Sequence, residues 1–217
     1  MHQSLTPAGA AMTASPLDAV LRQSGAAMVA RHGRMVAAHF ESTSAEVAAC
    51  LSTVGLADRS DRATLEVRGA PAGVDRALMA LAWVDDRAWW SRADEHRAIV
   101  RCEPADVAVC SSALGGATDV AVSDRSFAYA AVGVIGPHAG ELLRTASVGG
   151  PGVDVIVLRE AEGSFEALVA AQHGPLVWKQ LLEAGGPLHA ACVGSDALEQ
   201  LAASHRFDHR HGTARIH

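Results

Sequence analysis

The sequence predicts an α+β fold built from pseudo-symmetric β-α repeats. Stretches in which apolar and polar residues alternate are separated by stretches with helical spacing, and some of the strands follow one another like hairpins. No glycine-rich phosphate loop follows a strand, because neither G-x-G-x-x-G nor a P-loop is present. A short internal repeat is the third observation. Together they favour α+β over a doubly wound parallel sheet.

Composition limits the function classes. The chain has 217 residues, of which 49% are hydrophobic and 19% are charged, so it can bury a core as one domain or as two closely packed units. No run of about 18 uncharged apolar residues occurs, so we expect no membrane span. The net charge of −6, without a basic run, argues against a broad nucleic-acid surface. No secretory signal is evident, so a cytoplasmic location is expected.

Local signals place the elements of the first half. An amphipathic segment over 16–38 predicts a helix that begins at Pro16, with Ser15 as its cap. A second helix is expected over 44–51, with Ser44 as its cap. Alternation around Leu65 predicts a half-buried strand, and the following glycine and proline lead into a helix over 72–82.

The second half has clearer elements. The segment 107–113 is compatible with a short helix or a strand, and 120–135 alternates until Gly136. Pro187 ends the clearest helix of the chain. The remaining expected elements are helices over 139–145, 175–184 and 196–204 and strands over 153–158 and 167–170.

The internal repeat concerns two Asp-Arg-Ser tripeptides. Asp58-Arg59-Ser60 and Asp124-Arg125-Ser126 each precede an alternating run that ends at a glycine, with a helix expected after it. An Asp-x-Ser sequence favours a turn that leads into a strand. We therefore predict two pseudo-symmetric β-α halves that share a sheet.

Acidic residues supply the candidate site. Asp85 and Asp86 lie between Trp83 and the pair Trp89-Trp90, and carboxylates among bulky aromatics can bind a heterocycle that donates hydrogen bonds. A solvated turn is the alternative. Glu160, Glu162 and Glu166 follow a strand and could bind amino groups of a ligand or be exposed.

The cysteine and histidine patterns do not favour a metal-binding site. The four cysteines lie far apart without a C-x-x-C pair, which is typical of buried reduced thiols. The histidines near the C-terminus have offsets that could ligate a metal, but interleaved arginines favour a polar terminus. These histidines are His205, His209, His211 and His217.

Several short motifs follow one another in a fixed order along the chain. They are Ser15-Pro16-Leu17, Ser24-Gly25-Ala26-Ala27-Met28-Val29, Gly55-Leu56-Ala57-Asp58-Arg59-Ser60, Leu65-Glu66-Val67-Arg68-Gly69, Val84-Asp85-Asp86, Gly136-Pro137-His138-Ala139, Gly163-Ser164-Phe165-Glu166, Leu176-Val177-Trp178 through Leu181-Leu182-Glu183-Ala184-Gly185 and Val193-Gly194-Ser195. In their order these motifs resemble the aminomethyltransferase (glycine cleavage T-protein) family, and the resemblance covers about residues 15–204.

The resemblance implies a folate-binding domain over 15–204, between a flexible N-terminus (1–14) and a His-rich polar tail (205–217). After this domain, we expect the chain to be too short for the C-terminal barrel domain of that family. The implied function is tetrahydrofolate-dependent transfer of a one-carbon unit of the aminomethyl or methylene type from or to a small amine or amino-acid-derived substrate. The family pattern places Asp85 or Asp86 on the pterin as the essential carboxylate, with Glu166 near the same pocket and Glu162 as a second contact.

Two tryptophans are candidates for the wall that covers the pterin ring. Trp83 and Trp90 are selected only by their proximity to Asp85 and Asp86 in the sequence.

A second function follows from departures from the family pattern. Gln200 stands where the family has an arginine, and Asp61 stands where it has a histidine. In its shortness the chain resembles the gamma subunit of heterotetrameric sarcosine oxidase, which implies a partner chain, of the oxidase or lipoyl type. The alternative is therefore a non-catalytic subunit or binding module of an amine-oxidase-type complex with the same fold.

Overall fold

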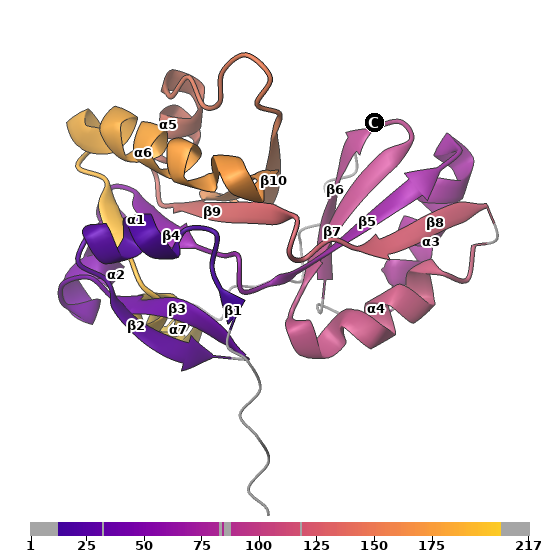
Figure 1. Ribbon diagram of the computed structural model, residues 1–217, viewed down its shortest axis with the longest axis horizontal. Helices are drawn as coiled ribbons and strands as arrows, with labels where there is room; N and C mark the ends of the chain where they lie inside the picture. The colour runs from indigo at the N-terminus through magenta and orange to yellow at the C-terminus, as the bar shows by residue number, and fades with distance from the viewer. Residues whose placement is uncertain (1–12, 32, 83, 85–87, 118, 205–217) are drawn as a thin grey trace, which may run out of the picture.

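The computed structural model describes residues 13–31, 33–82, 84, 88–117 and 119–204. This part of the chain forms three β-sheets with helices on their outer faces (Figure 1). The strands are β1 (Thr13–Ala14), β2 (Ala27–Arg31), β3 (Arg34–His39), β4 (Gly55–Asp58), β5 (Ala63–Gly69), β6 (Ala88–Asp94), β7 (Arg97–Cys102), β8 (Val120–Asp124), β9 (Tyr129–Ile135), β10 (Val155–Ala161), β11 (Ser164–Ala170) and β12 (Ala191–Val193). The helices are α1 (Asp18–Gln23), α2 (Thr43–Ser52), α3 (Pro71–Leu81), α4 (Val107–Leu114), α5 (Ala139–Thr145), α6 (Gly174–Gly185) and α7 (Ser195–Ser204).

Two larger sheets position the rest of the molecule. The central sheet has the order β10-β11-β9-β4-β12, and the second sheet has the order β6-β7-β5-β8. Helices α1, α5 and α6 pack on the outer face of the central sheet, with Trp178 in the core between them. Helices α3 and α4 cover the outer face of the second sheet. A small sheet, β1-β3-β2, lies beside α7.

The inner faces of the two larger sheets meet. Ile99 of β7 packs with Ala131 of β9, Leu158 of β10 and Leu168 of β11. Arg101 of β7 and Glu166 of β11 are buried between the same strands. The contact between the sheets is therefore partly apolar and partly charged.

The predicted repeat is present as two matching turns. The N–H of Ser60 donates to Asp58 Oδ1 at 2.9 Å, and the N–H of Ser126 donates to Asp124 Oδ1 at the same distance. Ser60 Oγ accepts the N–H of Ala131 at 3.0 Å. In the other copy, Ser126 Oγ accepts the N–H of Thr64 at 2.9 Å. Each turn therefore binds the strand that follows the other turn.

These turns carry the chain between the sheets. β4 lies in the central sheet and β5 in the second, whereas β8 lies in the second sheet and β9 in the central one. β4 pairs with β9 and β5 with β8, both antiparallel. The prediction of pseudo-symmetric β-α repeats in an α+β fold is confirmed. The expectation that the halves share one sheet is wrong, because they exchange strands between two.

The segment 16–38 is not one helix. α1 ends at Gln23, and Gly25 then adopts a φ of +89°, which side chains with a Cβ rarely adopt. β2 and β3 follow as a hairpin with Gly33 at a φ of +76°. The apolar residues after Gly25 therefore belong to strands, which their spacing alone did not show.

Three smaller expectations are corrected or settled. Ser42 and not Ser44 caps α2, since its Oγ accepts the N–H of Ala45. The strand around Leu65 is buried on both faces, because helices α3 and α4 cover one face of β5 and its other face meets the central sheet. The segment 107–113 is helical as α4.

No helix in the described ranges is long and apolar enough to cross a membrane.

Candidate functional site

The leading predicted carboxylates fall outside the described residues. Asp85 and Asp86, together with Trp83, lie in the positions that precede β6 and that the structure does not describe. The histidines of the C-terminal tail fall outside as well. Among the residues that are described, no group of His, Cys, Asp and Glu could hold a metal ion.

Glu166 is fully buried at the contact between the two larger sheets. Its Oε2 accepts a hydrogen bond from Arg101 Nε at 2.7 Å, and its Oε1 accepts one from Arg62 Nη1 at 3.1 Å. Buried charges are tolerated when they are paired and hydrogen-bonded in this way. Glu166 therefore holds arginines in place, and it does not line the cavity described below.

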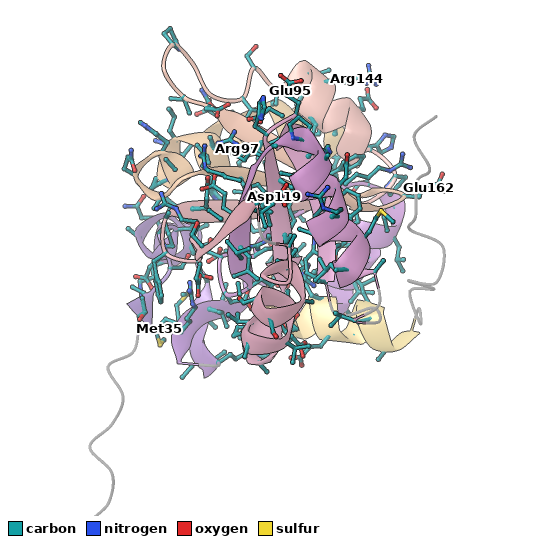
Figure 2. All side chains as sticks on the ribbon, turned by 90° about the vertical axis from the view of Figure 1, so that its right-hand side faces the viewer. Met35, Glu95, Arg97, Asp119, Arg144 and Glu162 are labelled. Atoms are coloured by element: carbon teal, nitrogen blue, oxygen red, sulfur yellow. The ribbon has the colours of Figure 1, made fainter. Side chains whose placement is uncertain are left out.

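Glu162 and Trp90 lie apart from Glu166. Glu162 occupies the turn between β10 and β11, is exposed and lies at the periphery of the molecule (Figure 2). Trp90 on β6 is 45% exposed. Its neighbour Trp89 lies on the other face of the strand, where the guanidinium carbon of Arg62 is 4.2 Å from the ring centroid. The structure brings Trp89, and not Trp90, to the charged cluster.

Arg101 forms hydrogen bonds with the crossover, which is the segment 59–62 that connects β4 and β5. Its side chain is 1% exposed. Its Nη2 donates to the carbonyl of Arg59 at 2.6 Å, and its Nη1 donates to the carbonyl of Arg62 at 3.2 Å and to Thr64 Oγ1. With the bond to Glu166, most donors of this guanidinium are satisfied. Arg101 therefore fixes the position of the residues between β4 and β5.

That crossover borders a cavity of about 280 Å³. Residues from β2, β3, the crossover, the β10–β11 hairpin and α7 surround it. Its apolar part includes Val36, Ile135 and Leu198, and its polar part contains carboxylates, guanidinium groups and a serine. The polar lining residues are Arg31, Asp58, Arg59, Asp61, Arg62, Glu103, Glu160, Ser164, Ser195 and Glu199.

Most of these lining charges are paired. Arg31 donates to Asp196 Oδ1 at 2.7 Å and also pairs with Glu199. Arg62 Nη1 donates to Glu160 Oε1 at 2.9 Å. Ser164 Oγ donates to the other oxygen of Glu160 at 3.1 Å. These contacts fix the cavity wall formed by the hairpin and the crossover.

Burial perturbs two further lining residues. It raises the pKa of Asp58, although hydrogen bonds with Ser15 and Ser60 oppose the shift. Burial lowers the pKa of Arg59, but the carboxylates of Glu160, Glu166 and Asp61 more than offset it, so the pKa is raised. Arg59 is therefore a permanent cation in the cavity.

Sequence reasoning did not find the arginines of this site. Arg59 and Arg62 lie in a polar stretch over 58–62, whereas Arg101 occurs singly between Val100 and Cys102. Arginine is rarely buried, so residue type predicts all three at the surface. Arg59 was visible as part of the repeat, but the repeat carries no signal for a cavity.

The cysteines are free, as their spacing predicted. Cys50, Cys102 and Cys110 are buried and Cys192 is partly buried. Burial raises the pKa of Cys50 and of Cys102 to about 12 and that of Cys192 to about 11. These thiols are unsuited to nucleophilic chemistry near neutral pH.

No protein-family model and no curated protein matches the chain. Solved structures do match it. The glycine cleavage system aminomethyltransferase T from Bartonella henselae superimposes with a TM-score of 0.68 and 16% identity over 86% of this chain, which spans 60% of that protein. A chain of the heterotetrameric sarcosine oxidase from Corynebacterium sp. U-96 superimposes with a TM-score of 0.51 and 19% identity, covering 82% of this chain and 96% of that one. At these identities the likeness establishes the fold, which this chain shares with both proteins.

Proposed function

We propose that the protein binds tetrahydrofolate and takes part in one-carbon transfer of the aminomethyl or methylene type from or to a small amine. One observation carries the proposal. Three segments that individually resemble the aminomethyltransferase family, and that are far apart in the sequence, line the same cavity. They contribute Asp58 and Arg59, Ser164 of the Gly-Ser-Phe-Glu stretch, and Ser195 of the turn before α7.

The cavity suits the pterin part of such a ligand. Its volume of about 280 Å³ lies near the lower limit of small-molecule sites, which begin at roughly 300 Å³. Carboxylates such as Asp61 can accept hydrogen bonds from the ring and amino N–H groups of a pterin, and apolar residues such as Ile135 can contact its faces. The longer remainder of a folate would then extend towards solvent.

Bound tetrahydrofolate would supply the nitrogen atoms that carry the one-carbon unit. The chain's own residues would bind and orient the ring. We assign the essential pterin carboxylate to Asp85 or Asp86, following the family pattern. Asp86 is two positions before β6, whose Trp89 contacts Arg62 at the cavity wall.

Calorimetric titration of the isolated chain with tetrahydrofolate tests this function. We expect a Kd in the micromolar range and at least a tenfold loss of affinity in either Asp85→Asn or Asp86→Asn, because an amide accepts fewer and weaker hydrogen bonds than a carboxylate. Asp119→Asn is the control, since this exposed residue, labelled in Figure 2, pairs with Arg76 of α3 and does not line the cavity. Absence of binding at any attainable concentration would refute folate binding by the lone chain.

A second candidate function is that of a non-catalytic subunit of an amine-oxidase-type complex. The extent of the likeness favours it, because this chain covers 96% of one chain of a heterotetrameric oxidase but 60% of the aminomethyltransferase. Gln200, in place of the family's arginine, agrees with it. Purification from the native source followed by light scattering and mass spectrometry tests it. Stoichiometric association with an oxidase supports this function, and a chain that purifies from the native source without a partner chain refutes it.

A further inference from the structure

Arg59 differs from the other arginines around the cavity. Its side chain is 10% exposed, and its stem passes over Gly133 of β9, where an added Cβ would lie 3.0 Å from Arg59 Cγ. In the described part of the chain Arg59 forms an ion pair with Glu166, whose Oε1 is 3.9 Å from Arg59 Nε and therefore beyond hydrogen-bonding distance. Its guanidinium donates no hydrogen bond to a described residue, although it lines the cavity.

A nearly buried guanidinium with open donors calls for an acceptor. A ligand atom that accepts a hydrogen bond from Arg59 would meet a charged donor that is held in place, so this contact should strengthen binding. The acceptor is better neutral than anionic, because Glu160, Glu166 and Asp61 already surround Arg59 and raise its pKa. A second anion would meet these carboxylates at close range.

Acceptors for a donating ligand lie in the same cavity. Asp61 forms no ion pair with any described residue, and it lines the cavity together with Arg59. A guanidinium and a carboxylate that line one cavity can together match the edge of a heterocycle that has a carbonyl next to N–H groups. The 4-oxo edge of a pterin has this arrangement.

We propose that Arg59 donates hydrogen bonds to the 4-oxo oxygen of the bound pteridine and thereby selects 4-oxo over 4-amino pteridines. This inference rests on the proposed function, which takes the cavity as the pterin site. A 4-amino group would present its own donors to the donors of Arg59 and leave both unsatisfied. Sites built to form a hydrogen bond reject analogues that cannot form it.

Folic acid and aminopterin test this selection, since they differ at position 4 of the ring in having an oxo or an amino group. Calorimetry should show that the wild-type chain binds folic acid at least tenfold more tightly than aminopterin. In Arg59→Met the affinity for folic acid should fall about tenfold or more and the preference should disappear. Arg59→Lys should retain part of the preference, because it keeps the charge and loses the planar fork.

Arg125→Met is the matched control. Arg125 occupies the same position in the second Asp-Arg-Ser turn, where it is exposed and does not line the cavity. It should bind both ligands as the wild type does. The Arg59 variants should fold, because the backbone of residue 59 makes the bonds to Ala131 and Arg101; urea unfolding checks this, and Arg59→Lys carries the test if Arg59→Met does not fold.

The outcomes separate this inference from the proposed function. Tetrahydrofolate binding together with equal affinities for folic acid and aminopterin, or with an unchanged preference in a folded Arg59→Met, overturns the role of Arg59 and leaves the proposed function standing. Absence of binding by any of these pteridines overturns both. A preference for folic acid that Arg59→Met removes and Arg125→Met retains supports the inference.

Discussion

Buried charges are the residues that distinguish this molecule from a plain α+β domain. Arg101 and Glu166 are each 1% exposed in their side chains, and they join the inner faces of two sheets. Desolvation of such a pair is offset only when nearly every donor and acceptor is satisfied, as it is for Arg101. The family resemblance implied that Glu166 lies near a pocket, but the sequence did not predict its arginine partners, because nothing local to β7 indicates that Arg101 faces another sheet.

Removal of the Glu166 carboxylate should destabilise the fold strongly. In Glu166→Ala the guanidinium of Arg101 remains buried without its counter-charge, so we expect a loss of about 3–5 kcal/mol in the free energy of unfolding. Glu166→Gln should cost less, because the amide oxygen still accepts a hydrogen bond. Urea denaturation measures both. Glu162→Ala, in the exposed turn of the same hairpin, should remain within about 0.5 kcal/mol of the wild type; equal losses at the two positions would contradict this account.

Among the secondary-structure elements, the sequence predicted the bounds best where the apolar residues keep one helical spacing throughout. α5 has the expected bounds, and α6 and α7 extend the expected ones by one residue at an end or at both. The prediction of one helix over 16–38 was wrong. This segment contains a short helix and a hairpin, and the spacing of their apolar residues is also compatible with a single helix. Prediction also failed for the adjacent tryptophans, because alternation places Trp89 and Trp90 on opposite faces without showing which face is inward.

The two turns of the repeat should contribute equally to stability. Ser60→Ala would leave the buried N–H of Ala131 without its acceptor, and Ser126→Ala would do the same to the N–H of Thr64. Each should cost about 1–3 kcal/mol, measured by urea denaturation. Ser123→Ala on the exposed face of edge strand β8 is the control and should be nearly neutral. A loss at only one of the two turns would show that the copies are not equivalent in energy.

The whole molecule is tied together by the two crossovers and by the charged contact between the sheets. The repeat predicted two related halves, but it could not show that strands change sheets, because pairing between distant strands leaves no local signal. Cys50 packs beside α7 and Cys102 packs beneath α3 and α4, so the two thiols report on opposite sides of this contact.

We therefore expect the two sides to unfold as one unit. With pKa values raised to about 12, both thiols should resist alkylation at pH 8 in the native state and react only after opening. Mass spectrometry of peptides alkylated at increasing urea concentrations should give coincident curves for Cys50 and Cys102. Earlier labelling of Cys102 would show that the second sheet opens independently.

The strand exchange at the two Asp-Arg-Ser turns also limits how the polypeptide can be divided. A fragment that stops between the copies contains β4 without β9 and β5 without β8, so it presents unpaired edges in both larger sheets. Two such fragments can complete each other, because every missing partner is supplied by the other piece. Co-expressed halves split near residue 118 should thus reassemble in trans, whereas either half alone should aggregate.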